Sequence, residues 1–103
     1  KLKVSNNSLT GEIQGIAYMK NLEILSLNGN KFHGTISKEI GEMQSLKYLN
    51  LQRNHFSGTM PKDLSKLGML EELRLDDNDL SGVAPPGLCN LRNAFLDVFV
   101  SDC

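Results

Sequence analysis

The chain has 103 residues, of which 22% are charged, and a formal net charge of −1 at pH 7. This balance excludes the strongly basic surface typical of proteins that bind nucleic acids or anionic membranes. No apolar run approaches the roughly 18 residues of a transmembrane helix, and no signal peptide opens the chain. We therefore expect one domain that is a fragment of a longer protein, with any membrane association through segments outside this sequence.

One pattern of apolar residues, asparagine and glycine recurs along the chain every 24 residues. A partial copy, one residue shorter, precedes three full copies. A sustained period of this length indicates a repeat architecture. We predict four coils, residues 1–21, 22–45, 46–69 and 70–93, followed by a cap strand within residues 94–103. The repeated positions are Leu2, Val4, Asn7, Leu9 and Gly11, then Leu22, Leu25, Leu27, Asn30, Phe32 and Gly34, then Leu46, Leu49, Leu51, Asn54, Phe56 and Gly58, then Leu70, Leu73, Leu75, Asn78, Leu80 and Gly82.

Each coil contains a short segment that alternates apolar and polar residues, at positions 2–4, 25–27, 49–51 and 73–75. This alternation predicts a strand with one buried face. Each coil returns the chain to the same place and direction, so the strands should form one parallel sheet.

An asparagine follows each predicted strand by three residues, where the chain must turn. Its amide can donate to and accept from turn backbone that has no strand partner. Stacked coils would align these side chains in a ladder. We expect this structural role, and no ligand role, for Asn7, Asn30, Asn54 and Asn78.

The rest of each coil is expected to be an irregular or extended segment followed by a short helical turn. Apolar residues recur every third position in the triplets Ile40, Met43, Leu46 and Leu64, Leu67, Leu70, which suits a single 3-10 turn. The two histidines, His33 and His55, occupy different positions of adjacent coils. We expect them not to align, and we therefore predict no zinc site at these residues.

The repeat breaks near the end of the chain, although residues 96–100 still alternate and can add one last strand shifted by a residue or so. Cys89 and Cys103 lie close together in this part of the sequence. They could form a disulfide that ties the last strand to the preceding limb, which would imply an oxidising compartment. The alternative is a pair of buried free thiols.

The repeat resembles the plant-type leucine-rich repeat, written LxxLxLxxNxLxGxIPxxL. The matching segments run from Leu22 to Ile36, Leu46 to Pro61 and Leu70 to Pro85. The resemblance implies an α/β solenoid: a right-handed leucine-rich repeat superhelix with a parallel sheet on its concave face and a C-terminal cap. The similar proteins are receptor-like kinase and receptor-like protein ectodomains and polygalacturonase-inhibitor-like proteins. They imply an extracellular or cell-surface binding module, without catalytic residues or a cofactor.

Side chains between the strand leucines should point outward on the concave face and display a binding surface. We predict a contact patch for a protein or peptide ligand, with a co-receptor as a further candidate partner. Tyrosine and arginine are frequent among residues that dominate interface energy. The alternative is an ordinary solvated face with Arg74 paired to Glu72 or Asp76. The patch comprises Tyr48, Asn50, Gln52, Arg53, Glu72, Arg74 and Asp76.

Two other functions remain open from the sequence: a structural segment that caps a longer array, and an intracellular repeat scaffold. Residues 77–82 begin like a calcium loop, but Leu88 stands at the twelfth place, where such loops need a bidentate glutamate. We therefore expect no metal site.

Overall fold

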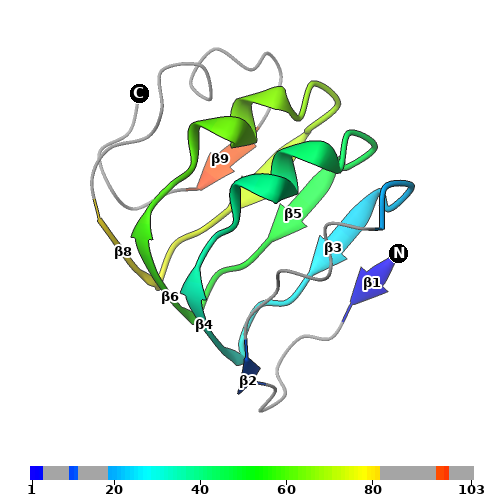
Figure 1. The fold of residues 1–103 in the computed structure, drawn as a ribbon. Coiled ribbons are helices and arrows are strands. Elements are labelled where there is room, and N and C mark those ends of the chain that lie inside the picture. Colours follow the sequence, from blue (N-terminus) through cyan, green and yellow to red (C-terminus); the bar gives the residue numbers. More distant parts are fainter. Residues whose placement is uncertain (4–9, 12–18, 82–94, 98–103) are drawn as a thin grey trace.

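A parallel sheet runs through the coils and holds one strand from each (Figure 1). The computed structural model describes residues 1–3, 10–11, 19–81 and 95–97, with backbone placement alone for residues 10–11 and 95–97. This is the predicted concave sheet, and we use that name for it. Its strands, in spatial order, are β1 (Leu2–Lys3), β3 (Ile24–Ser26), β5 (Tyr48–Asn50), β7 (Glu72–Arg74) and β9 (Phe95–Asp97).

The register of the concave sheet follows the sequence repeat. Leu25, Leu49 and Leu73 are Cα partners on neighbouring strands, and all three are fully buried. Each of these three strands is centred on the first leucine of its predicted segment and ends before the second leucine. The ladder of backbone hydrogen bonds nevertheless extends beyond the strand, where the N–H of Leu27 donates to the Asn50 carbonyl at 2.9 Å. At the far end Leu96 partners Leu73, so the last strand is shifted by one residue from the 24-residue repeat, as expected. The solenoid fold is thereby confirmed.

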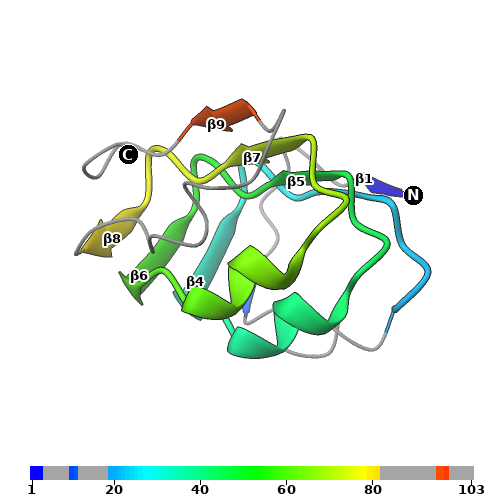
Figure 2. The same cartoon turned by 90° about the horizontal axis from the view of Figure 1, so that it is seen from above.

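A second sheet flanks the concave sheet (Figure 2). The sequence predicted an irregular or extended segment here; the segments are extended and pair with one another, which the pattern did not indicate. We call this the second sheet. Its strands are β2 (Thr10–Gly11), β4 (Lys31–Thr35), β6 (His55–Thr59) and β8 (Asp79–Ser81), in this order.

The second sheet has its own register. His33 of β4 is the Cα partner of His55 of β6, 22 residues later rather than 24. Ser57 and Asp79 keep the same spacing between β6 and β8. The expectation that the two histidines are not aligned was therefore wrong. That expectation assumed that every residue lies beside the residue 24 positions later in the chain. In β4 and β6 the partner is instead 22 positions later, so the strands are displaced by two residues from the repeat.

Two 3-10 helices, η2 (Lys38–Glu42) and η3 (Lys62–Lys66), lie on the side of the solenoid opposite the concave sheet (Figure 2). They confirm the predicted helical turns. Ser37 caps η2, because its hydroxyl accepts from the Glu39 N–H at 3.1 Å. Ile40 of η2 and Leu64 of η3 are fully buried, so each helix contributes apolar side chains to the interior.

The interior is one cluster of buried residues from successive coils. Phe56 has no exposed surface and stacks on the partly buried Phe32 of the preceding coil, with ring centroids 6.4 Å apart. Burial of each large apolar side chain contributes about 1.5–3 kcal/mol. The cluster comprises Leu25, Leu27, Ile36, Ile40, Met43, Leu46, Leu49, Leu51, Phe56, Met60, Leu64, Leu67, Leu70, Leu73, Leu75 and Leu80.

Asparagine side chains join successive coils at the turns after β5 and β7. The Asn54 amide donates to the carbonyl of Leu51 in its own coil at 3.1 Å and to that of Leu27 in the preceding coil at 2.9 Å. Its oxygen accepts from the Phe32 N–H at 3.1 Å. Asn78 makes the equivalent bonds one coil later.

Three features of the sequence lie outside the described residues: Asn7 of the predicted ladder and the two cysteines, Cys89 and Cys103. Within the described part of the chain, no helix combines the length and the apolar character that crossing a membrane requires.

Candidate functional site

The exposed side of the concave sheet displays two rows of side chains. Ile24, Tyr48 and Glu72 are Cα partners in one row. Partners on neighbouring parallel strands point to the same face of a sheet. In each row, side chains from different coils therefore lie side by side. The backbone hydrogen bonds of the parallel sheet hold them in these positions. The second row contains Lys3, Ser26, Asn50 and Arg74.

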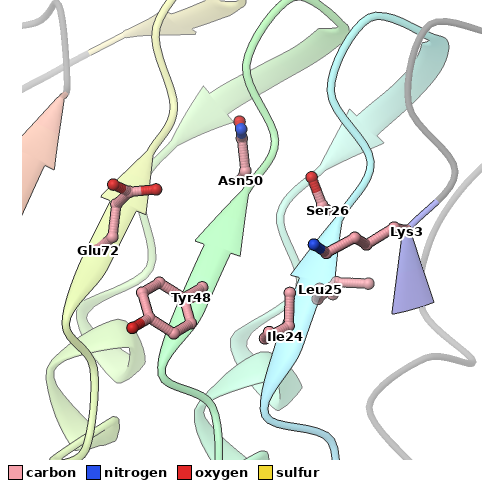
Figure 3. Close-up of a pocket in the computed structure, with 7 residues that line it drawn as sticks. All are labelled: Lys3, Ile24, Leu25, Ser26, Tyr48, Asn50 and Glu72. Carbon is pink, nitrogen blue, oxygen red and sulfur yellow. The ribbon is translucent and has the colours of Figure 1, made fainter. Parts of the chain in front are cut away.

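An open hollow of about 410 Å³ lies over β1, β3, β5 and β7. Figure 3 shows its lining, with Tyr48 and Glu72 on neighbouring strands and Lys3 extending from β1 toward β3. Tyr48 is 38% exposed, which is high for a large aromatic side chain on a structured strand. The lining residues are Lys3, Ile24, Leu25, Ser26, Tyr48, Asn50 and Glu72.

The hollow combines an apolar centre with opposite charges at its two ends. Ile24 and Tyr48 offer apolar and aromatic surface, while Lys3 lies on one side of them and Glu72 on the other (Figure 3). The Asn50 side-chain oxygen accepts from the Gln52 N–H at 3.2 Å, which orients the Asn50 amide. Such a surface can hold an apolar side chain of a ligand and pair charges on either side of it.

The predicted contact patch divides into two parts. Tyr48, Asn50 and Glu72 line the hollow. The remaining four residues of the patch do not line it: Gln52, Arg53, Arg74 and Asp76.

Arg74 and the turn residues of the patch are engaged within the protein. The Arg74 Nε lies 3.5 Å from a Glu72 carboxylate oxygen, the ion pair of the alternative interpretation. Arg53 has a positive φ of 56°, and its N–H donates to the Asp76 carbonyl at 3.1 Å. Gly29 and Asp77 have positive φ at the equivalent positions, so this residue shapes the turn before Asn30, Asn54 and Asn78.

Three residues that line the hollow were not part of the predicted contact patch: Lys3, Ile24 and Ser26. They precede the predicted patch in the chain, in coils whose displayed residues carry weaker chemical signals. The signal that could have found them is their shared row with Tyr48 and Asn50 in the predicted parallel register.

An ion pair whose two members have shifted pKa values lies on η3, away from this site. Lys66 Nζ is 3.0 Å from an Asp63 carboxylate oxygen. This hydrogen bond lowers the pKa of Asp63 from its ordinary value and raises the pKa of Lys66 from its ordinary value. Because η3 lies opposite the concave sheet, the pair has no direct role at the hollow.

A sequence model of the leucine rich repeat family matches residues 20–80, which is more than half of the chain. This chain belongs to the leucine-rich repeat family. The comparison with curated proteins found no match.

Solved leucine-rich repeat structures from Arabidopsis thaliana are similar to this chain over most of its length. In the crystal structure of the BIR3–SERK2 complex, the matched chain is 35% identical, with a TM-score of 0.83, over 98% of this chain and 58% of that one. The ectodomain of the membrane receptor kinase GASSHO1/SCHENGEN3, solved with CASPARIAN STRIP INTEGRITY FACTOR 2, is 38% identical with a TM-score of 0.87, over 90% and 11%. The ectodomain of the receptor kinase SOBIR1 is 31% identical with a TM-score of 0.87, over 98% and 56%.

These coverages mean that the chain spans between about a tenth and three fifths of the leucine-rich repeat chains just described. The similarity covers the concave sheet together with the rest of the described solenoid. Leucine-rich repeat ectodomains are generally non-catalytic. Among the residues that the structure describes, no three histidine, cysteine, aspartate or glutamate side chains gather in a group that could hold a metal ion.

Proposed function

We propose that this leucine-rich repeat segment binds an extended peptide, or an extended segment of a protein, across the hollow of its concave sheet. The observation that carries the proposal is the exposed Tyr48 beside Ile24, between the charges of Lys3 and Glu72. An aromatic side chain on a rigid strand offers a large contact area at a small cost in conformational entropy.

The charges give the bound segment a direction. A carboxylate of the ligand would pair with the Lys3 ammonium, and a basic side chain would compete with Arg74, 3.5 Å away, for the Glu72 carboxylate. An apolar side chain between them would cover Ile24 and Tyr48. Three such contacts in a line across the strands favour an extended chain over a compact ligand.

The proposal places the segment in the extracellular or cell-surface part of a non-catalytic receptor-like protein, with a peptide or a co-receptor as its partner. It is supported by the similar structures: the GASSHO1/SCHENGEN3 ectodomain was solved with CASPARIAN STRIP INTEGRITY FACTOR 2, and the HAESA receptor kinase with the peptide hormone IDA and the co-receptor SERK1. Membrane attachment of the parent protein belongs to the same proposal.

The test replaces Tyr48 by a photo-crosslinking phenylalanine in the full-length protein, expressed in its native host. A matched control carries the same group at Ser57, which is exposed on the second sheet. We expect light to link a discrete peptide or protein to position 48 and not to position 57. Identical products from both positions would overturn the proposal.

Affinity measurements on the linked partner then test the hollow itself. Removal of an aromatic residue that dominates an interface costs at least about 2 kcal/mol, so Tyr48→Ala should weaken binding roughly 30-fold. Ser57→Ala should leave the affinity unchanged. Unchanged affinity in a Tyr48→Ala, Ile24→Ala double variant would show that the hollow is not the binding site.

A further inference from the structure

The second sheet places the chain's two histidines next to each other on an exposed face. His33 and His55 are Cα partners on the neighbouring parallel strands β4 and β6. Both residues are exposed, and the residues that follow them, Gly34 and Phe56, are more covered. Partners in a parallel pair point to the same side, and neighbouring strands lie about 4.8 Å apart. The two imidazoles therefore share one solvent-facing surface.

This spacing suits chelation of one metal ion. A zinc–imidazole bond is about 2.0–2.1 Å long, so two nitrogens on one tetrahedral ion are about 3.3 Å apart. Rotation of the two side chains can bring their rings from a Cα spacing of about 4.8 Å to this separation. Imidazole is a preferred ligand for zinc, copper and nickel.

We propose that His33 and His55 form a two-histidine site for a divalent transition metal, Zn²⁺ or Cu²⁺, that links two successive coils. Because no third metal-binding side chain of the described residues joins a group with them, water fills the remaining coordination positions. The site is independent of the concave hollow, since it lies on the second sheet.

Two charged residues on β4 and β8 act on such an ion in opposite directions. Lys31 precedes His33 by two residues on the same exposed face of β4 and repels a cation. Asp79 of β8 is the partner of Ser57, which follows His55 by two residues, and its carboxylate attracts the ion from a diagonal position. The proposal therefore concerns an open, solvent-exposed site rather than an enclosed structural one.

The test is calorimetric titration of the protein with Cu²⁺ alone and with Zn²⁺ alone. We expect one ion per chain in the wild type, and tighter binding of Cu²⁺ than of Zn²⁺. His33→Ala and His55→Ala each leave a single imidazole. Loss of the second contact should lower the affinity on the order of 100-fold, because binding by two linked groups is that much tighter. The metal should also raise the unfolding midpoint of the wild type.

A permuted variant keeps the composition and changes only the alignment. In His55→Thr combined with Thr59→His, the imidazole moves four residues along β6, which is about 13 Å of strand. We expect this variant to bind as weakly as the single alanine variants, while Lys31→Ala binds at least as tightly as the wild type. Wild-type affinity in the permuted variant, or in the double variant His33→Ala, His55→Ala, would overturn the proposal.

Discussion

The side chains of Asn54 and Asn78 each tie the backbone of two coils together. Asn54 is almost fully buried and bonds both its own turn and the preceding coil. Its hydrogen bonds to the Leu27 carbonyl, the Leu51 carbonyl and the Phe32 N–H pair backbone groups that have no partner in a strand at the turn. The position could be predicted from sequence because an amide is one of few side chains that both donate and accept.

Asn54→Ala should therefore destabilise the protein. It leaves the Leu27 and Leu51 carbonyls and the Phe32 N–H without this partner. An unsatisfied buried polar group costs about 1–3 kcal/mol, and we expect a loss in this range from urea unfolding. Asn28→Ala is the matched control, since the Asn28 side-chain oxygen accepts a bond from the neighbouring Ser26 hydroxyl, within the same coil. Equal midpoints for the two variants would contradict the proposed role of the ladder.

The residues of the hollow were harder to predict than the ladder. Tyr48 was identified by its type alone, because an aromatic residue among polar neighbours is conspicuous in the sequence. Ile24 also occupies an outward-facing position of the repeat, but it was left out of the predicted patch because an isoleucine there carries no polar or aromatic signal of binding. Whether it lines a hollow depends on the side chains of the neighbouring strands, Lys3 and Tyr48, which the sequence of one coil does not contain.

At the scale of elements, the strands of the second sheet show what a repeat pattern omits. A 24-residue period defines equivalent positions but not the stagger between successive coils. In the concave sheet equivalent leucines meet, whereas in the second sheet the partners on β4, β6 and β8 are 22 residues apart. The segment from Lys31 to Thr35 also contains a glycine with positive φ at Gly34, which weakens any sequence signal for a strand.

The close packing of η2 against η3 supplies a prediction at this scale. A Cβ added at Gly41 of η2 would lie 2.5 Å from the Asp63 carbonyl oxygen of η3, too close for both helices to keep their places. Gly41→Ala should destabilise the protein by about 1–3 kcal/mol. Gly68→Ala is the control, because a Cβ there meets nothing within 4 Å. Thermal unfolding of both variants is the measurement, and a neutral Gly41→Ala would show that the helices can separate at little cost.

At the scale of the whole molecule, the coils share one core and should lose stability together. Buried side chains from successive coils form a single cluster that includes Phe56. In a solenoid each coil is stabilised mainly by its neighbours, so a defect in one coil reaches the next through shared packing. The stacked pair of Phe32 and Phe56 is one such contact between coils.

Phe56→Leu tests this coupling, because leucine already occupies the equivalent position at Leu80 and should keep the fold. Removal of the ring from a fully buried site should cost about 1–2 kcal/mol. Amide hydrogen exchange followed by mass spectrometry should show the same loss of protection in β3, β5 and β7, since each opens only when the shared core opens. Met69→Ala, at a side chain that is 54% exposed, should change exchange little. A loss confined to β5 and β6 would mean that the coils unfold one at a time.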